Sequence, residues 1–206
     1  DSQDGFSKPG DQLPLSRVQT VQTHTKNEAW GLALLNVHAN IPLKLAEQGL
    51  KYILIGDVEV QNEVDAAKAF TPVLPIIVTP LVASNLRSSA SKDARILGNA
   101  TVGTELTADG QSTDGKWLRV MSGDQLAWIS RQIVAEKEGS ISTLPIITAN
   151  TRTLMQSFRL NTGNATPSCT NAPPSMLAIQ SPSGVNSSIT VNGIDIRFAG
   201  TIILQT

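Results

Sequence analysis

The chain has 206 residues, a formal net charge of −1 and charged side chains at only 16% of its positions. Without a basic surplus it does not attract phosphate backbones, so nucleic-acid binding is excluded as a main role. Its apolar stretches are short and interrupted by proline. None approaches the roughly 20 residues that a membrane-spanning helix needs, so no membrane span is expected.

Strand and turn residues dominate the composition. Threonine, serine, asparagine, valine and isoleucine are common, whereas the helix formers lysine and glutamate are sparse. We therefore predict an all-β fold with at most one or two short helices. A surface with few charges is typical of exported β-proteins, so we expect an extracellular or cell-surface location. Because the chain begins with Asp1, we expect either that a signal peptide has been removed or that this is a piece of a longer protein.

Residues 1–82 are expected to form a first β segment. Alternating and apolar runs predict its strands, at 16–25, 28–41, 51–55 and 58–60. Residues 61–70 predict a short helix, because Val64, Ala67 and Phe70 recur at helical spacing. The proline-rich stretch 71–82 predicts an extended linker or an edge strand, because proline cannot donate a hydrogen bond to a central strand ladder.

Residues 83–138 change character, with short strands alternating with polar turns. "ADGQSTDG" (108–115) predicts a long polar turn. "KWLRVM" and "LAWIS" predict two strands joined by the tight turn "SGDQ". Short strands with a turn every eight to twelve residues are typical of a small barrel or sandwich.

Residues 139–206 predict a third segment, again of strands. Its clearest signal is "ITVNGIDIRF" (189–198), in which Asn192-Gly193 suits a type I′ turn between two alternating apolar runs. The chain ends on another expected strand, "AGTIILQT". Because the third segment is similar in composition to the first, we expect that the two pack together with the middle segment inserted between them.

The middle segment resembles a bacterial SH3 (SH3b) domain over about residues 83–137. The residues that carry this resemblance follow one another in the family's order, as Asn85-Leu86-Arg87, Ser88 to Ala90, Ile96-Leu97-Gly98, Gly103 to Leu106, Trp117 to Val120 and Trp128-Ile129. The resemblance implies a small SH3-like barrel between two β-sandwich-like segments. Two departures reduce the polar and aromatic character of any groove: Leu118 stands where the family often has tyrosine, and the entry loop lacks the usual glycine or proline.

The two tryptophans of this segment allow two interpretations. Bulky rings can fill the small interior of a barrel of about 50 residues, so Trp117 and Trp128 would then be core residues. Alternatively, the rings line a groove with Arg87 and Arg119 near its mouth, and the groove binds a peptide or a cell-wall fragment. Both interpretations place the two rings on strands, so the sequence does not decide between the interpretations.

The flanking segments are similar to stretches of large exported bacterial proteins that carry an SH3b domain in their middle. "PGDQLPLSRVQTVQT", "YILIGDVEV" and the stretch from Cys169 to Phe198 carry this weaker similarity. It implies that the chain is a processed piece of a larger precursor. Cys169, the single cysteine, would then form an intermolecular disulfide, pair with a cysteine outside the chain or remain a free thiol.

No pattern of an active site is found. A papain-like peptidase needs a histidine after its cysteine, but His24 and His38 both precede Cys169. The histidine spacing fits no zinc site, so no metal and no other cofactor is expected. Asp57 and Glu59 alternate on one strand, as a glycosidase pair could, but any strand that ends in a turn offers as much. We therefore expect that the chain is not an enzyme.

These features predict a non-enzymatic structural or adhesive protein of the bacterial surface or matrix. We expect its partners to be copies of itself or other surface proteins. Low charge leaves strand edges unprotected, and we expect the terminal strand Thr201, Ile202, Ile203, Leu204 to add to a neighbouring sheet. The alternative function is a targeting domain of an envelope hydrolase that binds peptidoglycan or a peptide.

Overall fold

A computed structural model of the chain describes residues 13–25, 30–39, 49–123, 125–163, 174–183 and 185–206. In these ranges the chain forms 16 strands and three short 3-10 helices, at Leu15–Arg17, Arg131–Ile133 and Ile141–Thr143. The prediction of an all-β fold is confirmed. Within the same ranges, no helix has the length and apolar character that a membrane crossing requires.

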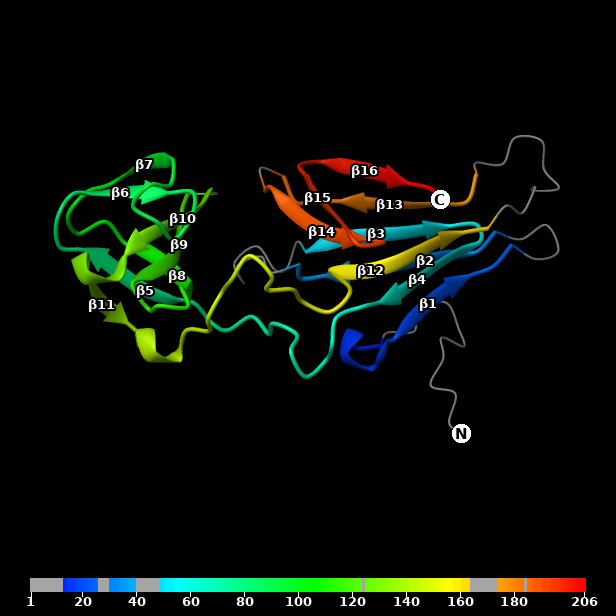
Figure 1. The fold of residues 1–206 in the computed structure, drawn as a ribbon, viewed down its shortest axis with the longest axis horizontal. Helices are drawn as coiled ribbons and strands as arrows, with labels where there is room; N and C mark the ends of the chain where they lie inside the picture. Colours follow the sequence, from blue (N-terminus) through cyan, green and yellow to red (C-terminus); the bar gives the residue numbers. More distant parts are fainter. Residues whose placement is uncertain (1–12, 26–29, 40–48, 124, 164–173, 184) are drawn as a thin grey trace.

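Strands from both ends of the sequence build one β-sandwich (Figure 1). Its five-stranded sheet has the order β1 (Thr20–Thr23), β4 (Val58–Asn62), β12 (Ser157–Thr162), β14 (Ser187–Val191), β15 (Ile194–Phe198). Its four-stranded sheet has the order β16 (Thr201–Leu204), β13 (Met176–Gln180), β3 (Leu50–Ile55), β2 (Leu32–Val37). β12 pairs with β4 and β13 with β3, both antiparallel, so each sheet joins the first and third segments of the sequence.

One apolar core lies between these two sheets. Tyr52 of β3 and Phe158 of β12 are completely buried in it, with ring centroids 5.4 Å apart. The Tyr52 hydroxyl donates to the Met155 carbonyl oxygen at 3.0 Å, and burial raises the pKa of Tyr52 far above its usual value. This tyrosine therefore stays neutral and fixes the start of β12 against β3.

The middle of the sequence forms a separate seven-stranded sheet (Figure 1). Its order is β11 (Val134–Glu138), β5 (Ile76–Pro80), β8 (Leu106–Gln111), β9 (Trp117–Ser122), β10 (Gln125–Ser130), β6 (Ser84–Arg87), β7 (Ile96–Ala100). It encloses its own core, which includes Leu86, Leu118, Val120 and Ile129. Because β4 and β12 are neighbours in the sandwich, the seven-stranded sheet is an insertion between two adjacent strands.

The predicted helix at 61–70 is wrong. Gln61 and Asn62 belong to β4, which has β1 on one side and β12 on the other. A turn follows, closed by the Lys68 amide donating to the Asp65 carbonyl oxygen at 2.9 Å. Val64, Ala67 and Phe70 lie beyond the strand, where the backbone bonds to a distant segment instead of within a helix: the Glu63 amide donates to the Ser157 carbonyl oxygen at 2.9 Å and the Phe70 amide to the Arg152 carbonyl oxygen at 2.8 Å.

The proline-rich stretch 71–82 is not an edge strand. Its residues Ile76–Pro80 form β5, which has β11 on one side and β8 on the other. Pro80 is the last residue of the strand, and the pairing with β8 covers only Ile76 to Val78. Pro80 therefore lies beyond the part of β5 that pairs with β8, so its missing N–H costs no hydrogen bond to β8.

The hairpin predicted at 189–198 is confirmed as β14 and β15. Asn192 and Gly193 both have positive φ, at 50° and 79°, which is the type I′ geometry. The Asn192 side chain accepts a hydrogen bond from the Leu160 amide at 2.9 Å. The turn therefore also attaches the hairpin to β12.

Candidate binding face of the seven-stranded sheet

Both tryptophans of the middle segment lie on the outer face of their sheet. Leu118 and Val120 of β9, and Ile129 of β10, point into the core of this sheet. Successive side chains of a strand point to opposite faces, so Trp117 and Trp128 point away from that core. Trp117 is nevertheless buried, whereas Trp128 is partly exposed. Neither ring points into the core of this sheet. The partly exposed Trp128 fits the groove interpretation, whereas Trp117 is buried outside that core.

Three of the four predicted binding residues form a row across this face. In the strand register, Trp128 lies directly opposite Arg119 on one side and opposite Arg87 on the other. Directly opposite residues share a face and lie close together. Trp117 is two residues along β9 from Arg119 and opposite Ser130, so it lies beside the row and not within it.

Arg119 has a buried partner that the sequence did not indicate. Its guanidinium donates from Nε to Asp109 Oδ1 at 2.8 Å and from Nη2 to Asp109 Oδ2 at 2.7 Å. Both side chains are only 7% exposed. A bulge in β8 between Ala108 and Gly110 accompanies this arrangement. Arg119 is therefore a structural residue of the face, and its charge is already neutralised.

Arg87 is also held in place, but less completely. Its Nη1 donates to the Ala94 carbonyl oxygen at 2.9 Å, and the side chain is half-buried. This bond ties β6 to the end of the loop that follows it. The guanidinium retains further N–H donors beside the Trp128 ring.

A hollow of about 730 Å³ lies over this face, between the seven-stranded sheet and the sandwich. Leu126 and Trp128 give it an apolar wall, and Ser88 to Ala90 form part of its rim. The opposite wall carries Arg152 and Arg197. The volume is within the range of sites that bind small molecules or short peptide segments.

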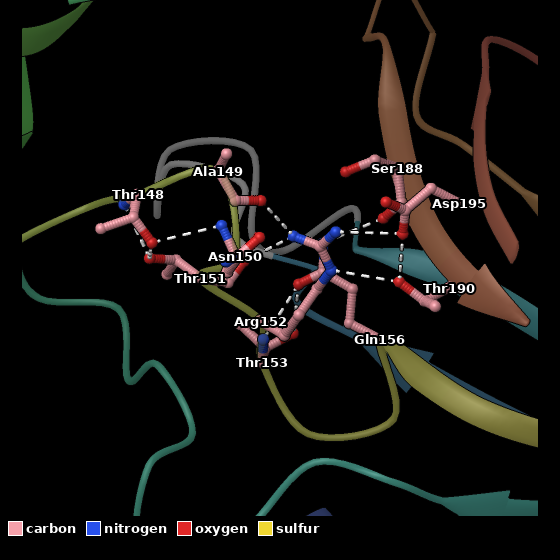
Figure 2. A network of polar contacts seen from close by, with 10 residues as sticks. All are labelled: Thr148, Ala149, Asn150, Thr151, Arg152, Thr153, Gln156, Ser188, Thr190 and Asp195. Carbon is pink, nitrogen blue, oxygen red and sulfur yellow. Dashed lines mark hydrogen bonds and ion pairs between the residues drawn. The ribbon is translucent and has the colours of Figure 1, made fainter. Parts of the chain in front are cut away.

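Arg152 organises the opposite wall of the hollow (Figure 2). Its guanidinium donates to the Ala149 carbonyl oxygen at 2.8 Å and to Asp195 Oδ1 at 3.3 Å. The hydrogen bond from the Thr190 hydroxyl, followed by the Arg152 guanidinium, lowers the pKa of the Asp195 carboxyl below its usual range. Arg152 therefore attaches the connection between the two β units to the hairpin β14–β15.

The predicted strand-addition residues lie away from this hollow. Thr201, Ile202, Ile203 and Leu204 form β16 on the sandwich, and Cys169 lies outside the described residues. His24 is exposed, with Nδ1 3.5 Å from Asp57 Oδ1. Within the described ranges, no three histidine, cysteine, aspartate or glutamate side chains are grouped so that they could hold a metal ion.

Three residues at this site were not predicted from the sequence: Asp109, Arg152 and Gln156, the last of which also lines the hollow. The expected turn at 108–115 is wrong in its first part, because residues up to Gln111 belong to β8 and Asp109 is buried. The dipeptide Asp109-Gly110 is typical of turns, but here it belongs to β8, where Gly110 lies opposite Arg119 of β9. No local signal marked Arg152 or Gln156.

A family model described as the bacterial SH3 domain matches residues 82–135. The match confirms the resemblance that the sequence carried over 83–137, and it covers 54 of the 206 residues (82 to 135 inclusive). It spans β6 to β10 and the start of β11, and therefore contains the row of Arg87, Trp128 and Arg119. No curated protein and no solved structure matches the chain.

Proposed function

Residues 82–135 form a bacterial SH3 domain, which is a binding domain, and from this premise we propose that the chain is an exported structural or adhesive protein of the bacterial surface or matrix. In this proposal it catalyses no reaction. The SH3 domain contacts other proteins or the cell wall, and the sandwich joins copies of the chain into a polymer.

The observation that carries the proposal is the open edge of β16. β16 pairs with β13 on one side, and it is the end strand of the four-stranded sheet as far as the described residues extend. Such an edge offers unpaired backbone donors and acceptors to another strand. Lysine, proline and inward-pointing charges protect many natural edges, and β16 has none of these.

The strand register identifies the groups that face this open edge. The Ser181 amide donates to the Gly200 carbonyl oxygen at 2.8 Å, so these two residues are a hydrogen-bonded pair. Hydrogen-bonded and non-hydrogen-bonded pairs alternate along an antiparallel ladder. Thr201 and Ile203 occupy the non-hydrogen-bonded positions opposite β13. Their backbone N–H and C=O groups therefore point outward, where a strand of a second copy can pair with them.

Replacing Thr201 with proline is expected to abolish strand addition at this edge. Proline removes the outward N–H of Thr201 and leaves the hydrogen bonds between β16 and β13 intact. Sedimentation velocity of the purified chain should then show that large assemblies disappear. The control Thr201→Val keeps the N–H and a β-branched side chain, and it should assemble like the unchanged protein. Equal assembly of the proline and valine variants would contradict addition at β16.

The hollow beside Trp128 favours a second function, the binding of peptidoglycan or a peptide. A half-buried aromatic ring next to a guanidinium is a common way to bind a peptide segment. If the hollow is the site, Trp128→Ala should reduce pelleting of the protein with purified cell-wall sacculi at least about tenfold. Because the ring lies outside the core, the substitution should cost only about 1 kcal/mol of folding free energy.

A matched core substitution separates binding from folding in this experiment. Ile129→Ala, at the next residue, removes a completely buried side chain and should cost about 2–5 kcal/mol. A Trp128→Ala variant that stays folded and still pellets with sacculi would exclude this ring as the wall-binding residue.

A further inference from the structure

The outer face of the four-stranded sheet is apolar across all four strands. In the register of the sheet, Leu34, Ile53, Ala178 and Ile203 form one continuous row from β2 to β16. A second row, Leu32, Ile55 and Met176, lies beside it. We call these seven side chains the outer apolar face.

The outer apolar face points away from the sandwich core. The alternate residues of the same strands, including Tyr52, Leu54 and Leu177, are completely buried between the two sheets. The face itself is open, with Leu32, Leu34 and Ile203 exposed to 72%, 69% and 62%. A contiguous group of exposed aliphatic side chains on a monomer marks an interaction surface, unlike scattered single ones.

The sequences of these strands also indicate that the outer face is covered. An antiparallel strand with one face in water alternates apolar and polar residues, whereas a strand buried on both faces is apolar almost throughout. "LALLNV" of β2, "KYILI" of β3 and "TIIL" of β16 are of the second kind. The five-stranded sheet differs, because β4 has Glu59 and Gln61 on its outer face. Two of the three outward rows of the four-stranded sheet therefore have the composition of a covered surface, and the third row is polar.

The absence of charge on the outer apolar face favours a second copy of the chain as the partner that packs on it. None of the seven side chains is ionisable, and the nearest charge on the face is Lys51, in the polar row beyond Leu34 and Ile53. Two identical faces can therefore meet without opposing like charges. The low net charge of −1 adds little repulsion between whole copies.

The size of the face predicts a dimer of modest strength. Four strands about 4.8 Å apart span roughly 19 Å, and two rows of side chains cover about four residues, or roughly 13 Å, along each strand. The resulting footprint of roughly 250 Å² is smaller than the ~800 Å² per partner of a standard interface. Contacts around the edge of the face, at β2 and β16, would enlarge it.

We infer that the outer apolar face packs against the same face of a second copy, so that two sandwiches form a four-layer dimer. This inference rests on the self-association in the proposed function and adds a second contact to it. Edge pairing at β16 extends a sheet from one copy to the next, whereas face packing joins two such sheets. Together the two contacts would give a polymer that is two copies, and therefore four sheets, thick.

The test is carried out on the full chain with the β16 edge already blocked by Thr201→Pro. This protein should sediment as a dimer that dissociates on dilution. Adding Leu34→Glu places a charge at the β2 end of the row, and should weaken the dimer at least about 100-fold and leave a monomer. The matched control is Leu74→Glu, since Leu74 is 82% exposed and lies outside every strand, and it should leave the dimer unchanged.

Folding is checked in every variant by circular dichroism and thermal unfolding, and Ile203→Glu repeats the test from the other end of the row. A Thr201→Pro protein that is monomeric at all concentrations would overturn face packing, and would mean that the chain itself or another partner covers the face. A Leu34→Glu protein that remains dimeric would place the interface elsewhere. Neither outcome depends on assembly through the β16 edge, which the comparison of Thr201→Pro with Thr201→Val tests separately.

Discussion

Replacing Arg119 with alanine is expected to lower the free energy of unfolding of the SH3 domain by about 3–5 kcal/mol. The substitution leaves Asp109 as a buried carboxylate without the guanidinium that it pairs with, and both side chains are 7% exposed in the intact protein. Burying an unpaired charge costs far more than an exposed ion pair contributes. Urea unfolding followed by tryptophan fluorescence measures the loss.

Two controls establish that the buried charge is the cause. Lys137→Ala breaks an ion pair with Glu105 whose side chains are each 54% exposed, and it should change stability by no more than about 1 kcal/mol. The double change Arg119→Met with Asp109→Leu removes both charges and should recover most of the stability that Arg119→Ala loses. A loss below about 1 kcal/mol for Arg119→Ala alone would contradict this account of the pair.

Phe158→Ala is expected to destabilise the sandwich by about 3–5 kcal/mol, because it leaves a large cavity in the core. Phe158 is completely buried and packs against the Tyr52 ring, which joins the two sheets. Tyr52→Phe serves as the milder control. It removes only the hydrogen bond to the Met155 carbonyl oxygen and should cost about 1 kcal/mol.

Calorimetry of these variants also tests whether the two cores unfold separately. The sandwich core and the core of the seven-stranded sheet are two distinct groups of buried side chains. We therefore expect two unfolding transitions. Phe158→Ala should lower only the transition of the sandwich, and Arg119→Ala only that of the SH3 domain. A single transition that both substitutions lower equally would show that the two cores unfold as one unit.

Local patterns in the sequence predicted those parts of the fold that depend on neighbouring residues. The hairpin 189–198 follows from an alternating pattern and from a dipeptide that readily adopts positive φ. Short strands and turns predicted a small barrel or sandwich at 83–138, and the resemblance to the bacterial SH3 family, which the family model confirms, identified it further. Residues 61–70 show the limit of local patterns, because Gln61 and Asn62 belong to β4 and the backbone of Glu63 and Phe70 bonds to the distant residues Ser157 and Arg152.

The candidate site could be predicted only in part. Arg87, Arg119 and Trp128 were identified as a group, and the register places them in one row. The sequence does not show which face of the sheet carries this row. The face depends on where the core lies, and strands that are apolar on both faces do not indicate the side of the core. Arg152 and Gln156 reach the hollow from a distant segment, so their role depends on tertiary structure alone.

The outer apolar face was likewise hidden in the sequence. The aliphatic runs of β2, β3 and β16 are visible in it, but the fact that they share a sheet is not. Seven residues that are far apart in the chain become neighbours only through the strand order β16-β13-β3-β2. The order of strands that are far apart in the sequence could therefore not be predicted from local patterns.

The central claim is that this chain associates with itself, and the mass of the native protein tests it most directly. Light scattering should be measured over a wide range of concentrations, with electron microscopy of the same samples. The account predicts species well above the 21.9 kDa of one chain, growing with concentration into ordered assemblies. A single species of 21.9 kDa at every concentration would contradict it, and the ligand of the hollow beside Trp128 would then become the main question.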